Sequence, residues 1–326
     1  VNTEINGKPG KRETSTMPGS AGSSWYFLRY IDPDNETEIA DKKLLEHWMP
    51  VDLYVGGPEH AVGHLLYSRM WNNFLYDKGY VPVKEPFQKL VHQGMILGAN
   101  GIKMGKRYPE FIVDPNVIVD RYGADTLRLY EMFMGPLEAS KPWSEQGVEG
   151  ARRWIERVWR LCMETPEKIT EDPTPELEYV YNCTIKKVTE DIDSLNFNTA
   201  ISQMMIFIND CYKADKVNRD MIINFIKVLS PFTPHLCEEI YQHYTGAETI
   251  AYVSWPKYDP AKLEMNAVTI VVQVNGKVRT KFDIRKDEDK AVVEQTALEQ
   301  EALKPFLEGK TVRKVIVVPN KIVNIV

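Results

Sequence analysis

The chain has 326 residues, a net charge of −6, and 43% hydrophobic and 26% charged residues. This length allows two or three domains with sizeable cores, and the composition is that of an ordinary globular protein. No apolar run approaches the length of a membrane span and no signal peptide opens the chain, so we expect a cytoplasmic protein without membrane contact. The negative charge argues against broad wrapping around nucleic acid but leaves room for local basic faces.

The four cysteines, Cys162, Cys183, Cys211 and Cys237, all fall in predicted helices, and none forms a CxxC pair. We expect reduced core residues of a cytosolic protein rather than disulfides or metal ligands. The first residue is Val1 and not Met, which favours a piece of a longer protein.

The first third of the chain has the pattern of a parallel α/β unit. Residues 1–17 are polar and Gly-rich and indicate a strand, and residues 23–31 predict a helix. A short buried strand at 51–55, a helix at 59–77 and a second strand at 89–97 follow. In such a unit the ligand sites lie at the carboxyl ends of the strands.

From about Val117 the pattern becomes helical and predicts an antiparallel bundle. Pro231 and Pro234 interrupt the periodicity between the last two helices. The predicted helices lie at 145–163, 174–193, 197–215, 218–230 and 234–244.

A different pattern ends the chain. Strands at 268–274 and 277–284 flank Asn275-Gly276, a strong two-residue hairpin signal. A helix at 287–303 and strands at 311–318 and 321–326 complete a small α+β domain. Strict alternation places Val278, Thr280, Phe282 and Ile284 on one face of the hairpin. It places Lys277, Arg279 and Lys281 on the other, which is either a phosphate-contacting stripe or a solvated face.

Residues near the end of the first strand have the chemistry of a ligand site. Gly56 and Gly57 allow close approach of the backbone, and Glu59 could bind ribose hydroxyls. His60 and His64 lie four apart and could line one pocket, although histidines that only pack a helix are the plainer alternative. We expect no metal site, because Glu59 precedes the first histidine and the HExxH arrangement is absent.

Two neighbouring segments could complete such a pocket. Ser23 and Tyr26 are three apart and could frame a small substrate, or simply begin a half-buried helix. Gln93 could reach a sugar, and the backbone near Met95 could read an adenine edge, or both could belong to an ordinary strand end.

A lysine loop follows the second strand. After Gly98-Ala99-Asn100-Gly101, the sequence Ile-Lys-Met-Gly-Lys-Arg holds Lys103 and Lys106 three apart. Two ammonium groups on a loop of small residues suit closure over a polyphosphate, although alone the pattern would indicate a solvated loop. A second basic cluster, on the helix at 145–163, is Arg152, Arg153, Arg157 and Arg160.

In this order, these pieces resemble the bacterial-type leucyl-tRNA synthetases, a family of class I aminoacyl-tRNA synthetases. The lysine loop stands where class I enzymes carry the KMSKS signature. The match runs from Arg12 to Val326, and the C-terminal block favours leucine over isoleucine or valine enzymes. The matching blocks are 23–26, 51–64, 103–107, 122–128, 143–159, 230–235 and 272–279.

The resemblance implies ATP, with Mg²⁺, leucine and tRNA-Leu as substrates and a monomeric enzyme of protein biosynthesis. It implies that Lys103 and Lys106 stabilise the pyrophosphate side of ATP, by charge and positioning. The implied leucine-binding residues are Ser23, Tyr26, Tyr54, His60 and His64. The implied adenosine-binding residues are Gly56, Gly57, Glu59, Gln93 and Met95, with Lys106 on the phosphates. The implied tRNA-binding residues are Arg152, Arg153, Arg157, Arg160, Lys277, Arg279 and Lys281.

The resemblance also implies the domain plan and fold class, α/β plus all-α. Residues 1–112 match the second half of a Rossmann-like catalytic domain, and 113–144 a connecting segment. Residues 145–257 match an antiparallel helical bundle of the class I anticodon-binding type. A linker at 258–267 then leads to a small α+β tRNA-binding domain at 268–326.

The chain departs from the family pattern in two ways. It contains neither the His-Ile-Gly-His signature nor an editing domain, so we expect the 326 residues alone to be inactive. In the lysine loop Gly105 and Arg107 replace serines, and Ser20 stands where many relatives carry an aromatic residue. Two alternatives remain: a stand-alone tRNA-binding or assembly module without catalysis, and a nucleotidyltransferase for a small molecule.

Overall fold

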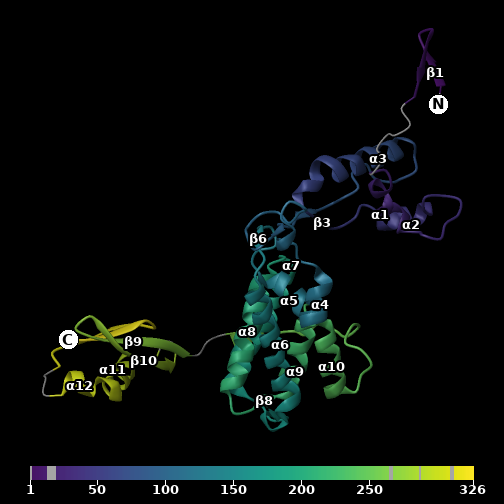
Figure 1. The fold of residues 1–326 in the computed structure, drawn as a ribbon. Coiled ribbons are helices and arrows are strands. Elements are labelled where there is room, and N and C mark those ends of the chain that lie inside the picture. Colours follow the sequence, from purple (N-terminus) through teal and green to yellow (C-terminus); the bar gives the residue numbers. More distant parts are fainter. Residues whose placement is uncertain (1, 13–19, 264–266, 286–287, 309–311) are drawn as a thin grey trace. The chain divides into compact units, whose positions relative to one another are not determined.

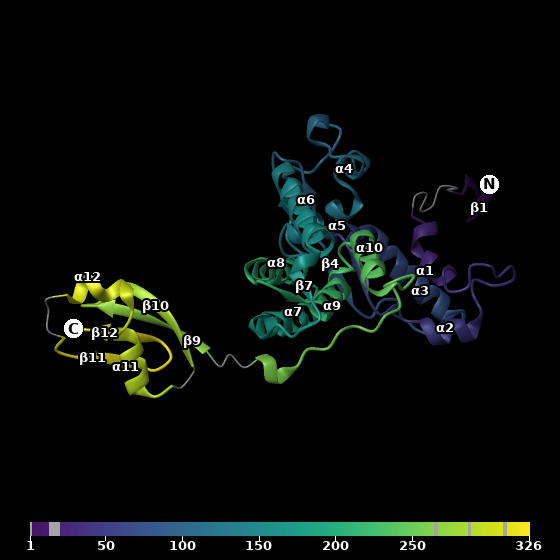
Figure 2. The same cartoon turned by 90° about the horizontal axis from the view of Figure 1, so that it is seen from below.

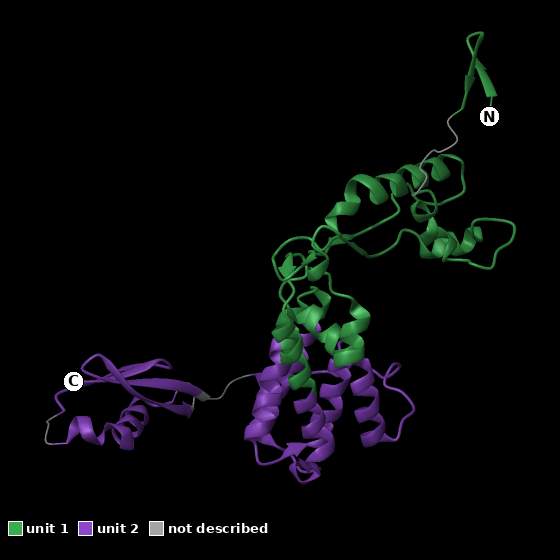
Figure 3. Ribbon diagram, in the orientation of Figure 1, with its two compact units in different colours: residues 1–155, 191–201 green, residues 156–190, 202–326 purple. Residues whose placement is uncertain are grey.

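The computed structural model describes residues 2–12, 20–263, 267–285, 288–308 and 312–326. Parts of four predicted segments lie outside the described residues: 1 and 13–17 of the first strand region, 264–266 of the linker, 287 of the last helix and 311 of a strand. The chain forms two compact units, one of residues 1–155 and 191–201 and one of residues 156–190 and 202–326 (Figure 3).

The first unit begins with a hairpin of β1 (Asn2–Ile5) and β2 (Lys8–Lys11), turned at Asn6 and Gly7, both with positive φ. The α/β part follows. Its elements are α1 (Tyr26–Arg29), α2 (Lys42–Trp48), β3 (Tyr54–Gly56), α3 (Leu66–Asp77) and β4 (Leu90–His92).

Strands β3 and β4 pair in parallel, with Tyr54 opposite Leu90, so the predicted α/β unit is present. Buried side chains from α1, α2, α3 and the connecting loops form its core: Phe27, Leu28, Ala40, Leu45, Met49, Leu75 and Val81. This core holds the helix α3 that follows β3, and thereby the carboxyl end of β3, in place.

The helix predicted at 59–77 is not uniform. It begins with a 3-10 turn at Pro58–His60, continues as a π-type turn at Ala61–Leu65, and becomes α3 only at Leu66. Pro58 suits the first turn because its missing N–H needs no partner there. The wider π turn rotates the residues before it relative to those on α3.

The single strand predicted at 89–97 is wrong, because the chain changes partner at Gly94. Strand β4 pairs with β3, whereas β5 (Ile96–Leu97) pairs in parallel with β6 (Lys141–Pro142). Gly94 N–H donates to the carbonyl of Leu137 at 2.7 Å. A Cβ at Gly94 would lie 2.1 Å from the carbonyl oxygen of Ala139, so only glycine fits.

Two short helices and a longer one follow in the chain: α4 (Pro115–Tyr122), α5 (Ala124–Phe133) and α6 (Glu145–Trp159). Asp114 caps α4 by accepting a hydrogen bond from Asn116 N at 2.9 Å. Gly123, with φ of 90°, makes the turn between α4 and α5, a conformation that favours glycine.

The first helix predicted for the bundle, at 145–163, is α6 only to Trp159 and continues as a π turn at Arg160–Glu164. The other four predicted bundle helices are present within two residues at each end. They are α7 (Pro175–Asp193), α8 (Phe197–Lys213), α9 (Arg219–Leu229) and α10 (Pro234–Thr245) (Figure 1). Within the second unit their apolar faces meet in a buried core, where the ring centroids of Phe207 and Phe225 lie 5.1 Å apart.

A short parallel pair, β7 (Ile169–Thr170) with β8 (Val217–Asn218), joins the ends of the bundle helices. Beside it, Lys168 Nζ donates to the carbonyls of Cys211, Tyr212 and Ala214 at 3.2, 2.8 and 2.8 Å. An ammonium at this position satisfies carbonyls that the end of α8 leaves without helical partners.

The end of the chain forms a four-stranded sheet with helices, as predicted. Its elements are β9 (Ala267–Val274), β10 (Lys277–Arg285), α11 (Lys290–Leu298), α12 (Lys304–Leu307), β11 (Val315–Val318) and β12 (Ile322–Ile325). The strand order is β10-β9-β12-β11, with β12 parallel to β9 and the other neighbours antiparallel (Figure 2).

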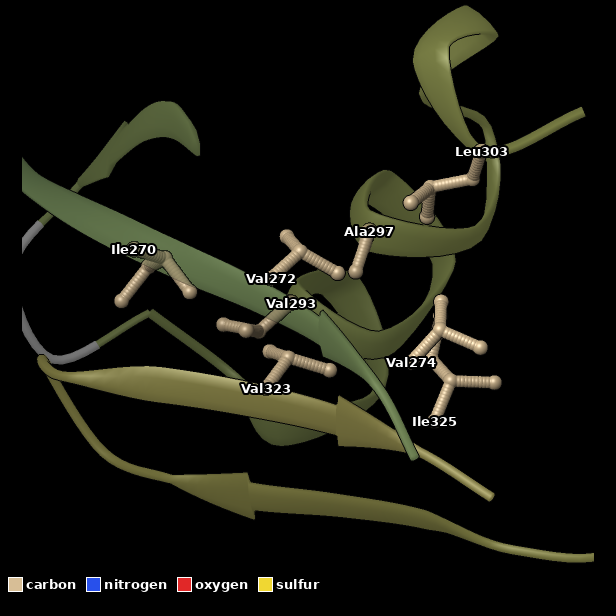
Figure 4. Packing of buried hydrophobic residues seen from close by; sticks show 8 residues of the cluster. All are labelled: Ile270, Val272, Val274, Val293, Ala297, Leu303, Val323 and Ile325. Atoms are coloured by element: carbon tan, nitrogen blue, oxygen red, sulfur yellow. The ribbon is translucent and has the colours of Figure 1, made fainter. Parts of the chain in front are cut away.

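One face of this sheet packs on α11 and on Leu303, which follows α11 in the chain, to form the core in Figure 4. There Val272 and Val323 from the strands meet Val293 and Ala297 from α11. The helix predicted at 287–303 ends earlier, at Leu298. A 3-10 turn at Glu301–Leu303 and the short helix α12 follow it.

Candidate active site

A cavity of about 450 Å³ lies at the carboxyl end of β3. Every residue predicted for the leucine pocket lines it, as do all those predicted for adenosine except Met95. The lining is Ser23, Tyr26, Tyr54, Val55, Gly56, Gly57, Glu59, His60, His64, Leu65, Leu90 and Gln93. The structure therefore brings together residues from three separate segments of the sequence, 23–26, 54–65 and 90–93.

A chain of hydrogen bonds forms the polar wall of this cavity. The hydroxyls of Tyr26 and Tyr54 lie 2.8 Å apart, and Tyr54 Oη lies 2.5 Å from Nε2 of His64. The rings of Tyr54 and His64 also stack, with centroids 5.7 Å apart. Since each group holds the next, the three side chains act as one preformed unit.

Burial sets the protonation of this unit. It lowers the pKa of His64, with a further contribution from the nearby His60, because the imidazolium loses solvation. It also raises the pKa of Tyr54, helped by the hydrogen bond with Tyr26. At neutral pH the wall is therefore uncharged, and it offers a neutral imidazole and two phenol hydroxyls to a ligand.

The sequence did not single out Ser68, which is fully buried and lies behind His64. Its Oγ is 3.5 Å from Nδ1 of His64, at the outer limit of hydrogen bonding. The two residues are four apart, so the helical period contained the signal that could have found it.

A second cavity, of about 370 Å³, shares Gly57, Glu59 and Gln93 with the first and adds Met95. Its remaining lining is Gly94, Ile96, Glu131, Met132, Leu137 and Lys141. The two cavities adjoin at the three shared residues. The carboxylate of Glu59 folds back against Gly57 there, so that a Cβ at Gly57 would lie 2.2 Å from its Oε2.

The sequence also missed Glu131 and Lys141 in this second cavity. Burial raises the pKa of Glu131, against the opposing charge of Arg128, and it lowers the pKa of Lys141. Lys141 Nζ donates to the carbonyls of Gly135 and Pro136 at 3.2 and 2.7 Å, which fixes its position.

Backbone hydrogen bonds fix the first residues of the lysine loop, whereas the side chains of its two lysines are exposed to solvent. Gly98 N donates to the carbonyl of Ile102 at 2.8 Å, and Gly101 makes the turn with φ of 74°. Lys103 and Lys106 are both exposed, and neither lines the two cavities. The structure thus places the predicted catalytic lysines on a surface loop.

The structure shows the surroundings of Gly105 and Arg107, the two positions at which this loop differs from the KMSKS signature. Gly105 has open space around its Cα, with no atom within 4 Å of an added Cβ, so a serine would fit there without collision. Arg107 stacks its guanidinium on Tyr108, 5.4 Å from the ring centroid.

Of the arginines predicted to bind tRNA, two lie in the first unit. Arg152 donates from Nη1 to the carbonyl of Tyr122 at 3.2 Å, and Arg153 is exposed. Arg152 therefore has a structural partner beside the turn between α4 and α5.

The other two arginines of this cluster lie in the second unit. The guanidinium of Arg157 lies 4.8 Å from the ring centroid of Tyr212, and Arg160 pairs with Glu164 at 3.7 Å. Both side chains keep exposed surface, although Arg157 is partly buried.

The basic stripe of the C-terminal hairpin differs from its predicted arrangement. Val278 pairs with Gln273 and Thr280 with Val272, so Arg279 is an extra, bulged residue. The alternation predicted across this point is wrong. Val278 lies on the helix-free face and is 55% exposed, while Lys277 lies opposite the core residue Val274.

Other site types find no support among the described residues. No group of three or more His, Cys, Asp or Glu side chains could share a metal ion there, and no described helix is long and apolar enough to cross a membrane. The four cysteines are free thiols, three of them buried, and burial raises the pKa of Cys162 to about 12.

Two family models match the chain. Residues 33–141 match "tRNA synthetases class I (I, L, M and V)", and residues 175–294 match "Anticodon-binding domain of tRNA ligase". Over 93% of its length the chain is 30% identical to the agnB2 LeuRS of Agrobacterium radiobacter K84, solved in a ternary complex with tRNA and LeuAMS, with a TM-score of 0.69. The chain belongs to the class I tRNA synthetases. It spans 41% of the length of that LeuRS.

As a class I tRNA synthetase chain, it has the predicted fold: a Rossmann-like α/β part and a helical anticodon-binding domain. The predicted family resemblance is thereby confirmed. The methionyl-tRNA synthetase of Mycobacterium tuberculosis, in complex with methionyl-adenylate, is also similar, at 15% identity and a TM-score of 0.48 over 61% of this chain and 45% of its own.

Proposed function

We propose that the protein to which this chain belongs is a leucine–tRNA ligase. It would activate leucine with ATP to leucyl-adenylate and transfer the leucyl group to tRNA-Leu. The cavity at the end of β3 is the observation that carries this proposal, because it gathers the amino-acid residues and most of the adenosine residues expected for the family. The 30% identity to a LeuRS supports leucine as the amino acid.

The lining of the first cavity suits leucine. Val55, Leu65 and Leu90 offer apolar surface to a branched aliphatic side chain. The carboxylate of Glu59 and the hydroxyl of Tyr54 are acceptors for an ammonium group. A neutral His64 adds no positive charge that would repel that ammonium, which agrees with its lowered pKa.

The second cavity would hold the adenosine of ATP, whose Mg²⁺ complex is the substrate. Gln93 and Glu59 line both cavities, so leucine and ATP would meet beside them. A carboxylate oxygen of leucine would bond to the α-phosphorus as the bond from that phosphorus to the bridging oxygen breaks and pyrophosphate leaves. Lys103 and Lys106 would stabilise the charge on the leaving pyrophosphate.

The bundle and the C-terminal domain would bind tRNA-Leu. The match to an anticodon-binding domain supports this role for the bundle. Lys277, Arg279 and Lys281 offer cations to phosphates in the C-terminal domain. We expect a cytoplasmic monomer.

Two binding measurements on the 326-residue chain test the proposal. Calorimetry would compare leucyl-, isoleucyl-, valyl- and methionyl-adenylate analogues. Filter binding would compare tRNA-Leu with a non-cognate tRNA as salt is varied. Preference for the leucyl analogue and salt-sensitive preference for tRNA-Leu are expected. Preference for another analogue would refute leucine, and tRNA binding without binding of any analogue would favour the stand-alone binding module.

The activity of the isolated chain is a separate part of the proposal. The 326 residues contain no His-Ile-Gly-His sequence, so leucine-dependent ATP–pyrophosphate exchange by this chain alone should stay at background. Exchange well above background would contradict this expectation.

A further inference from the structure

The bulge in β10 gives Arg279 a position that no regular hairpin would give it. Because Val278 and Thr280 pair with adjacent residues of β9, Arg279 has no cross-strand partner of its own. Its side chain is exposed, and the ion pairs among the described residues do not include it. An unpaired arginine on a bulge would ordinarily sample many rotamers.

Phe306 restricts that freedom. The guanidinium carbon of Arg279 lies 3.9 Å from the centroid of the Phe306 ring, which is stacking distance. The ring is half-buried and packs against the core cluster of the C-terminal domain. Its short helix α12 begins with Lys304 and Pro305, directly after the buried Leu303. The ring is therefore held by the core, and the arginine is held by the ring.

We propose that Phe306 is a positioning residue that holds Arg279 ready to bind a phosphate of the tRNA backbone. This inference rests on the proposed tRNA-binding function and adds to it a residue that touches no tRNA itself. One face of the guanidinium lies on the ring, while its N–H edges stay available for the oxygens of a phosphate. The ordering of a long side chain is thus complete before tRNA arrives.

The same geometry separates Arg279 from its basic neighbours. Lys281 lies opposite Val271 on the helix-free face of the sheet, and Lys277 lies opposite Val274 near the turn. Within the described part of the chain, neither of these lysines stacks on an aromatic ring or forms an ion pair. Phe306 should therefore matter for Arg279 and not for the lysines.

The test is tRNA-Leu binding by the 326-residue chain at several salt concentrations. Phe306→Leu keeps apolar volume but removes the ring face, whereas Phe306→Tyr keeps the face. Phe282→Leu is the matched control, because Phe282 packs against the same core cluster from β10. Arg279→Ala, alone and combined with Phe306→Leu, shows whether the two residues act together.

Phe306→Leu should weaken binding roughly two- to fivefold, and Phe306→Tyr should restore it. Phe282→Leu should bind tRNA-Leu as tightly as the wild-type chain does, even if it destabilises the C-terminal domain as much as Phe306→Leu does. Arg279→Ala should weaken binding and reduce the salt slope by about one, and Phe306→Leu should then add nothing.

Three results would overturn the inference: wild-type affinity in Phe306→Leu, equal losses in Phe306→Leu and Phe282→Leu, or a Phe306→Leu loss that persists in full without Arg279. Failure of the wild-type chain to bind tRNA would instead overturn the proposed tRNA-binding function, and the inference with it.

Discussion

Gly94 is the position where a single added methyl group should damage both the fold and the site. In Gly94→Ala the new Cβ would lie 2.1 Å from the carbonyl oxygen and 2.2 Å from the carbonyl carbon of Ala139. The obstacle is backbone and not a flexible side chain. The segment from Gln93 to Ile96 must therefore move away from residues 137–141, and that movement pulls apart the second cavity.

The size of the effect follows from what must be lost. Relief of the collision separates Gly94 N from the carbonyl of Leu137, now at 2.7 Å, and Met95 N from Ser140 Oγ, now at 3.1 Å. Each hydrogen bond contributes about 1 kcal/mol, and overpacking against a fixed neighbour costs about 1–3 kcal/mol. The local cost is then about 3–5 kcal/mol, or more than about a hundredfold in the equilibrium for local opening.

Hydrogen exchange followed by mass spectrometry is the suitable assay, because a chain of two compact units has no single unfolding transition. Peptides covering 90–97 and 136–143 should lose protection in Gly94→Ala. The matched control is Gly63→Ala, where an added Cβ meets no atom within 4 Å. Wild-type protection of both peptides in Gly94→Ala would refute the reasoning.

Three further outcomes are expected. Tyr54→Phe removes the hydroxyl that joins Tyr26 to His64 and should lower affinity for a leucyl-adenylate analogue about fivefold; calorimetry that shows wild-type affinity would contradict it, and Tyr80→Phe is the exposed control. Burial lowers the pKa of His64, so the folded chain loses stability as the pH falls below about 6.5, the ordinary pKa of histidine, and the imidazole must be protonated. NMR should give a titration midpoint for His64 below pH 6.5. A midpoint above pH 6.5 would contradict burial as the dominant influence. Lys168→Met leaves three carbonyls without their donor and should destabilise the second unit by about 1–3 kcal/mol, seen as faster exchange at the end of α8, whereas unchanged exchange would mean that water replaces the ammonium.

Most helices were predictable because local periodicity decides them. The bundle helices from α7 to α10 carry apolar residues at helical spacing, with breaks at Pro231 and Pro234, and the structure has them within two residues of the predicted ends. The hairpin turn at Asn275-Gly276 was equally local, and both residues have the positive φ that such a turn needs.

The irregular backbone was not predictable, because distant residues determine it. Nothing in residues 89–97 shows that Ala139 will approach Gly94, yet that approach ends one strand and begins another. The bulge at Arg279 is similar. Its register depends on which residues of β9 face the core, and strict alternation along β10 alone gives the wrong face for Val278.

In the candidate site, too, the residues that belong to a local sequence motif were predictable and those placed by the tertiary fold were not. The residues around β3 were found because the motif pattern places them, and the structure gathers them around one cavity. Ser68, Glu131 and Lys141 belong to no motif and reach the site only through the tertiary fold. The roles of all these side chains, and of Lys103 and Lys106, remain predictions that the proposed binding measurements test.

The departures from regular structure coincide with the predicted functional residues. The 3-10 turn carries His60 and the π turn carries His64 into the first cavity. The break at Gly94 lies between Gln93, which lines both cavities, and Met95, which lines only the second, and the bulge at Arg279 accompanies its stacking on Phe306. Each departure redirects a side chain that a regular helix or strand would aim elsewhere. Since irregular backbone costs stability, its recurrence at these positions is what a chain would show if ligand contact, and not packing, determined the local geometry.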